Sequence, residues 1–190
     1  MKNKIIKYFY PLIISLFAVL LSSCSSCDQN EEISIHYKNG TLFCNGKHNI
    51  EQKLFSKEKY RVGYWNFFYP NGKLESKIYY DNDGSMKTYE GFNHAGNLNE
   101  KYRAYPDSEF VYYYNPNGNL DKKIIKKFDS DDEDPDVYGE VYEYYPDGKL
   151  YSIRHFVNDK NDGICKTFDE SGNIILELNY EEGIISNQNL

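Results

Sequence analysis

The sequence predicts an all-β protein, a meandering antiparallel single-layer sheet of tandem β-hairpin repeats. Three observations lead to this prediction. The 190 residues include 20 Tyr and 11 Phe, which favour the half-buried surface of a strand. The mean hydropathy of −0.74 is low for a protein with a large two-sided core. A short motif, glycine followed two residues later by an aliphatic residue, recurs along the chain.

Residues 1–23 have the successive regions of a bacterial export signal. The basic stretch 1–7 precedes an apolar stretch, 8–21, that is shorter than the roughly 20 residues of a membrane-spanning helix. The following Leu21-Ser22-Ser23-Cys24 resembles a lipobox, which implies lipid on Cys24. An ordinary secretory signal and an uncleaved anchor are the alternatives. We therefore expect a lipoprotein of the cell envelope, held to the outer membrane on its periplasmic or surface face.

The segment after the lipobox is polar and acidic. Residues 24–32 have few groups to bury, so we predict a disordered tether, followed by a repeat domain over 33–190. Without residues 1–23 the chain has 19 basic and 29 acidic residues, a formal charge near −10. Such a surface repels phosphate backbones and excludes nucleic acid as a partner, whereas it steers a basic protein toward the chain.

The repeat has about six units, each marked by a turn glycine. These are Gly40, Gly72, Gly96, Gly118, Gly148 and Gly172. From the second unit on, the residue four positions before this glycine is aromatic, and we expect these aromatic side chains to face one buried strip: Phe68, Phe92, Tyr114, Tyr144 and Phe168. Turns such as Tyr69-Pro70-Asn71-Gly72 join an aromatic-rich run to an alternating run, which predicts a hairpin.

Three units carry an additional pair of matching positions. A second glycine lies nine residues before the turn glycine, and an aromatic residue lies eight after it: Gly63 and Tyr80, Gly139 and Phe156, Gly163 and Tyr180. The third and fourth units lack the second glycine, which leaves their register open. The segments 105–109 and 129–136 interrupt the period, and we predict loops on the rim of the sheet there.

This pattern resembles the MORN-variant repeats of the YwqK-like antitoxin family over roughly residues 57–183. The clearest stretches are 63–80, 139–156 and 163–180. The resemblance implies a meandering antiparallel sheet and a non-catalytic protein that acts by binding a protein partner, such as a toxin. The functional alternatives are a structural scaffold lipoprotein of the envelope and a glycan-binding surface lipoprotein that uses its aromatic residues.

Catalytic and metal-binding patterns are not evident in the sequence. We therefore expect no enzyme activity, no cofactor and no metal site. Cys44 and His48 are four residues apart, but a structural zinc site needs a second such pair. Cys44 and Cys165 belong to the first and last units, which a linear sheet holds much farther apart than the roughly 7 Å that a disulfide tolerates. We therefore predict that these two cysteines are not bonded to each other.

Overall fold

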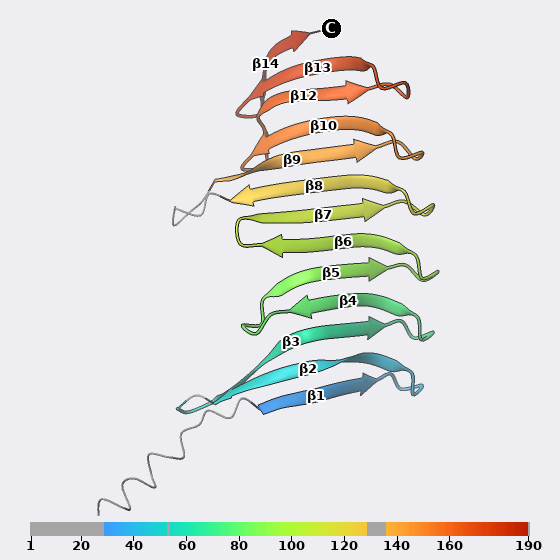
Figure 1. Ribbon diagram of the computed structural model, residues 1–190, viewed down its shortest axis with the longest axis vertical. Coiled ribbons are helices and arrows are strands. Elements are labelled where there is room, and N and C mark those ends of the chain that lie inside the picture. Colours follow the sequence, from blue (N-terminus) through green and yellow to red (C-terminus); the bar gives the residue numbers. More distant parts are fainter. Residues whose placement is uncertain (1–28, 53, 129–135, 190) are drawn as a thin grey trace, which may run out of the picture.

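The computed structural model describes residues 29–52, 54–128 and 136–189, and these residues form one open antiparallel sheet (Figure 1). Each strand pairs with the next one along the chain, except that the two-residue β11 pairs only with β10. This order confirms the predicted all-β meander. The strands are β1 (Gln29–His36), β2 (Leu42–Gln52), β3 (Lys57–Phe68), β4 (Leu74–Tyr80), β5 (Met86–Phe92), β6 (Leu98–Tyr105), β7 (Ser108–Tyr114), β8 (Leu120–Phe128), β9 (Val137–Tyr144), β10 (Leu150–Val157), β11 (Lys160–Asn161), β12 (Gly163–Phe168), β13 (Ile174–Glu181) and β14 (Ile184–Asn189).

The six predicted turn glycines lie in turns along one edge of the sheet, at the right in Figure 1. At the second turn, the Gly72 N–H donates to the Tyr69 carbonyl at 2.8 Å, and the Tyr69 N–H donates to the Lys73 carbonyl at 2.8 Å. Gly72 has φ +82°, which a residue with a side chain rarely adopts, and Pro70, directly after Tyr69, supplies the fixed φ of the second turn position. The same pair of bonds closes all six turns.

The register beside these turns is the same in every unit. The residue four before the turn glycine pairs with the aliphatic residue two after it, and a bulge adjoins the pair. Phe92 pairs with Leu98 and Tyr114 pairs with Leu120, so the third and fourth units keep the common register. The turn therefore fixes the pairing even where the second glycine is missing.

Two boundaries differ from the prediction. The tether 24–32 was too long, because β1 begins at Gln29. The acidic residues of this segment lie on the outer strand β1 and are stabilised there by ion pairs. Glu31 lies 2.6 Å from Lys59, and Glu32 lies 3.5 Å from Lys47. The segment 105–109 is not an inserted loop, because Pro106 and Asp107 alone form the turn between β6 and β7. A turn of two residues reverses the chain without a glycine.

Three of the sequence predictions lie outside the described residues. These are the export signal 1–23, the lipid site Cys24 and the acidic segment 129–136, of which only Asp136 is described. Among the described residues, none forms a helix long and apolar enough to cross a bilayer.

Little of the sheet is fully shielded from water. The buried side chains of the described residues gather toward the two ends of the stack: Cys44, Val62, Trp65 and Ser76 in β2–β4, and Ser152, Phe156 and Cys165 in β10–β12. The five aromatic residues predicted to face a buried strip are each only half-buried. A single layer has no second sheet or helix to cover them, so the strip remains partly open to water.

Candidate binding surfaces

The strand pairing divides the side chains into two faces, because cross-strand partners point to the same side of a sheet. We call one the apolar face. Its central row, from β3 to β10, is Trp65, Ile78, Tyr89, Tyr102, Val111, Ile124, Val141 and Arg154. We call the other the mixed face. Its adjacent row is Asn66, Lys77, Glu90, Lys101, Tyr112, Lys123, Tyr142 and Ile153.

The best-packed site on the apolar face is the Trp65 indole over Gly46. Trp65 is only 2% exposed, and a Cβ atom on Gly46 would lie 2.2 Å from its ring. The indole N–H donates to the Lys47 carbonyl at 3.0 Å, and the Arg61 guanidinium lies 4.9 Å from the ring centroid. Glycine is therefore required at position 46 for close approach, not for an unusual backbone angle.

The additional glycines and aromatic residues of the repeat are direct cross-strand partners. Gly63 pairs with Tyr80, Gly139 with Phe156, and Gly163 with Tyr180. At Gly139 the Phe156 ring occupies the place of the missing side chain, since an added Cβ would lie 2.9 Å from its Cζ. In the fourth unit the corresponding pair is Glu109 and Lys126, so opposite charges replace the glycine and aromatic pair.

The mixed face carries a hollow in the middle of the sheet. It has a volume of about 590 Å³ and lies over β6, β7 and the turn between them. Its lining includes four aromatic residues, Tyr105, Phe110, Tyr112 and Tyr114, and two basic residues, Lys101 and Arg103. Tyr105 and Phe110 meet edge to face, with ring centroids 5.6 Å apart.

The hollow and its border have an excess of positive charge. Lys101 lies 2.9 Å from the Glu90 carboxylate, so its charge is partly compensated. Arg103 is exposed and, within the described part of the chain, has no ion pair of 4 Å or less. On the other side of the hollow, β8 adds Lys123 opposite Tyr112 and Lys127 opposite Ser108. Asp107 is the one acidic residue of the lining.

The four lysines of β8 are divided between the two faces by the alternation of the strand. Lys123 and Lys127 lie on the mixed face, and the Lys123 ammonium lies 5.3 Å from the centroid of the Tyr142 ring. Lys122 and Lys126 lie on the apolar face, where Lys122 is 3.5 Å from Glu143. The local basic cluster in the sequence is therefore not one surface patch.

One tyrosine in each of the two rows, Tyr102 and Tyr142, is hydrogen-bonded to a carboxylate. Burial and the 2.8 Å hydrogen bond to Glu109 raise the pKa of Tyr102 to about 12. The 2.5 Å hydrogen bond to Glu140, together with burial, raises the pKa of Tyr142 to about 12. Both hydroxyl groups therefore remain protonated donors at any physiological pH.

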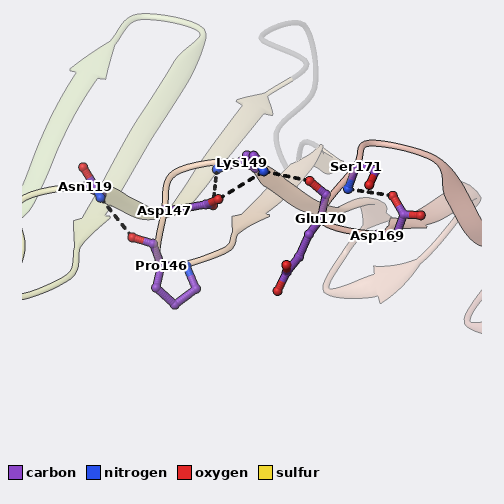
Figure 2. A network of polar contacts seen from close by, with 7 residues as sticks. All are labelled: Asn119, Pro146, Asp147, Lys149, Asp169, Glu170 and Ser171. Atoms are coloured by element: carbon purple, nitrogen blue, oxygen red, sulfur yellow. Dashed lines mark hydrogen bonds and ion pairs between the residues drawn. The ribbon is translucent and has the colours of Figure 1, made fainter.

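The edge that carries the turns is fixed by polar contacts between successive units. Figure 2 shows Asn119 donating to the Pro146 carbonyl at 2.9 Å and Lys149 donating to the Glu170 carbonyl at 2.9 Å. Elsewhere on this edge a turn tyrosine spans two units, as where the Tyr69 hydroxyl donates to the Phe92 carbonyl at 2.7 Å. The polar side chains of these turns already hydrogen-bond to the neighbouring unit and are less available to a partner. This edge is therefore a weaker candidate for binding than the mixed face.

The described histidines and cysteines do not gather at one site. No three or more His, Cys, Asp and Glu side chains of the described residues come together as a metal site. The thiols of Cys44 and Cys165 are both free, which confirms that they do not form a disulfide. Burial raises the pKa of the Cys44 thiol, and His48 packs against Trp65 with ring centroids 4.9 Å apart.

The sequence prediction named the turn glycines and aromatic residues, but it did not name Lys101, Arg103 and Phe110. The sequence did contain a signal for a shared surface, because Lys101, Arg103 and Tyr105 stand at alternate positions, which places them on one face of a strand. Only the pairing of Arg103 with Phe110 and of Lys101 with Tyr112 places them beside aromatic residues.

Comparison with known proteins agrees with the repeat geometry. The model of the MORN repeat variant matches residues 61–82, 138–158 and 161–182. These segments are the three units in which a glycine faces an aromatic residue across the hairpin. No curated protein shows significant similarity to the chain. The chain is therefore a β-hairpin repeat protein that carries the MORN repeat variant in at least these three segments.

Proposed function

We propose that this chain is a lipid-anchored protein of the bacterial cell envelope that binds a protein partner, without catalysis, through the mixed face. The hollow over β6 and β7 carries the proposal. It combines half-buried aromatic surface with an exposed guanidinium, and both are enriched at the centres of protein interfaces. The sheet leaves this surface uncovered by any other described element.

The local charge decides which groups of a partner contact the hollow. The chain as a whole is acidic and attracts a basic protein at long range. At physiological ionic strength this attraction is screened beyond about 8 Å, so contacts within the interface depend on neighbouring charges. Arg103, Lys123 and Lys127 favour carboxylates there. We therefore propose a partner that places an acidic and apolar segment in the hollow, whatever its net charge.

Site-specific photo-crosslinking in intact cells tests the binding face. A photoreactive residue at Phe110 is expected to give a discrete adduct, and one at Tyr113, on the apolar face, is expected to give none. Arg103→Glu should abolish the Phe110 adduct, whereas the matched reversal Lys126→Glu on the apolar face should leave it intact. Adducts of equal yield from both faces would contradict the proposal, and retention on polysaccharide without any protein adduct would favour a glycan ligand.

The resemblance to YwqK-like proteins supports an antitoxin or immunity role as the specific form of this binding. Deletion of the gene is then expected to cause a growth defect that depends on a toxin, and Arg103→Glu should reproduce it. Normal growth of the deletion strain in the presence of competing cells would count against this role. An envelope scaffold would instead yield adducts to structural envelope proteins at the same position.

The anchor is tested separately through Cys24. Cys24→Ala should prevent incorporation of labelled palmitate and move the protein from the membrane fraction to the soluble fraction. Cys27→Ala is the matched control, because its position lacks the preceding aliphatic residue and should retain the label. Labelling that persists in Cys24→Ala would refute the assignment.

A further inference from the structure

The hairpin formed by β2 and β3 ends in an apolar tip. Leu54 and Phe55 are adjacent in sequence and are 92% and 96% exposed, the two most exposed large apolar side chains of the described residues. The strands leading to them are paired up to Gln52 and Lys57, so the tip projects from a formed hairpin. Single exposed apolar residues are common on protein surfaces, but two consecutive ones at a projecting turn expose a small continuous apolar surface.

The tip lies on the same edge as the start of the described chain. Gln29, the first residue of β1, pairs with Ile50, which precedes Leu54 by only four residues (Figure 1). Cys24 is five residues before Gln29, a span of at most roughly 17 Å when fully extended. A lipid on Cys24 would therefore hold this corner of the sheet next to the bilayer surface.

We propose that Leu54 and Phe55 insert into the membrane to which Cys24 attaches the protein, as a second contact beside the lipid. This inference rests on the proposed lipid anchor. The occupant is a lipid surface because the tether keeps the tip within reach of one. One point of attachment at Cys24 would leave the orientation of the sheet open, whereas a second apolar contact at the tip would fix it against the bilayer.

The charges around the tip indicate that insertion is driven by apolar surface and not by anionic lipid. Two lysines flank the tip in the sequence, Lys53 and Lys57, and the two acids Glu51 and Glu58 adjoin them. Lys59 is paired with Glu31 at 2.6 Å, so the hairpin end has little net positive charge. Insertion at this corner would also orient the sheet. Twelve steps between paired strands at about 4.8 Å each place β14 about 58 Å from β1, so the last repeat lies far from the inserted corner.

The single Trp of the chain makes a direct test possible. Trp65 is 2% exposed and lies ten residues after Phe55, about 33 Å at roughly 3.3 Å per strand residue, so a second Trp at position 55 reports on the tip. Full-length lipidated Phe55→Trp is reconstituted in phosphatidylcholine vesicles with brominated acyl chains. We expect the fluorescence emission of the Trp at position 55 to shift to the blue and to be quenched by bromine. Ile184→Trp, at a 74% exposed position on β14, is the matched control and should show neither change.

The outcomes separate the tip from the anchor. Vesicle-bound Phe55→Trp protein without quenching would overturn the insertion while leaving the lipid anchor intact. Quenching that requires phosphatidylglycerol and disappears at high salt would also overturn it, because that result indicates electrostatic adsorption. Binding of Cys24→Ala to the vesicles at the level of the lipidated protein would overturn the anchor and with it this inference.

Discussion

Replacing Gly139 with Ala should destabilise the sheet more than the same change at any turn glycine. A Cβ at this position would lie 1.9 Å from the Ile125 carbonyl oxygen and 2.9 Å from Phe156 Cζ. The ring could rotate, but the carbonyl belongs to the backbone of β8 and can move only if the pairing of β8 with β9 opens. Gly148 is the matched control, because it has φ +89° and nothing lies within 4 Å of an added Cβ.

The expected magnitudes differ severalfold. Overpacking costs about 1–3 kcal/mol, and the 1.9 Å contact with a backbone oxygen favours the upper end; a displaced backbone hydrogen bond adds about 1 kcal/mol. The reduced entropy of the unfolded chain offsets about 0.4–1 kcal/mol of this, so Gly139→Ala should lose about 3 kcal/mol of unfolding free energy. Gly148→Ala carries a left-handed backbone penalty of about 1–2 kcal/mol. The reduced entropy of its unfolded chain offsets about 0.4–1 kcal/mol of this, which leaves a loss of about 1 kcal/mol.

Thermal and urea unfolding of the two variants measure this difference. At about 2–4 °C per kcal/mol for a chain of this size, the gap of about 2 kcal/mol corresponds to about 4–8 °C between the two melting temperatures. Amide exchange should locate the damage in β8 and β9 in Gly139→Ala, since neighbouring units of a repeat sheet open separately. Equal melting temperatures, or a larger loss in Gly148→Ala, would refute the reasoning from steric contact.

Three further predictions concern hydrogen bonds, pH and thiol access. Tyr69→Phe should lower the unfolding free energy by about 0.5–1.5 kcal/mol by removing the bond to the Phe92 carbonyl, whereas Tyr64→Phe, at an exposed position, should change it by less than about 0.5 kcal/mol. Burial alone would raise the pKa of Glu143, but the hydrogen bond from Ser152 and the charges of Arg154 and Lys122 outweigh it and lower the pKa. The lowered pKa stabilises the fold above the ordinary pKa of Glu, and this stability is lost as the pH falls through the pKa of Glu143 in the folded protein. In acid titration, Glu143→Gln should therefore lose stability less steeply than wild type below about pH 4. The Cys44 thiol should react with a thiol reagent only on unfolding in urea, and rapid labelling of the native protein would contradict its burial.

Much of the fold follows from local features that the sequence displays directly. A glycine at positive φ, preceded by Pro or Asn/Asp turn residues, specifies the hairpin turn without help from distant residues. The aliphatic residue two after each turn glycine then sets the register, which is why the six turns and the order of the units follow from the sequence. The glycine and aromatic pairs, such as Gly139 and Phe156, were visible as fixed offsets for the same reason.

The boundaries of the sheet depended on contacts that no local pattern encodes. The acidic residues Glu31 and Glu32 favour a solvated tether until the pairing of β1, β2 and β3 brings Lys59 and Lys47 within reach of them. The turn at Pro106 lacks the usual glycine, so the two strands that it joins were visible only once Arg103 was paired with Phe110.

The sequence by itself therefore determined the class of fold, the positions of the turns and the repeat, because each depends on residues close together in the chain. The tertiary structure alone decided which side chains share a face, how deeply each is buried and where aromatic and basic residues meet. These properties arise from pairing between strands, and a shift of one residue in that pairing would move every side chain of a strand to the opposite face.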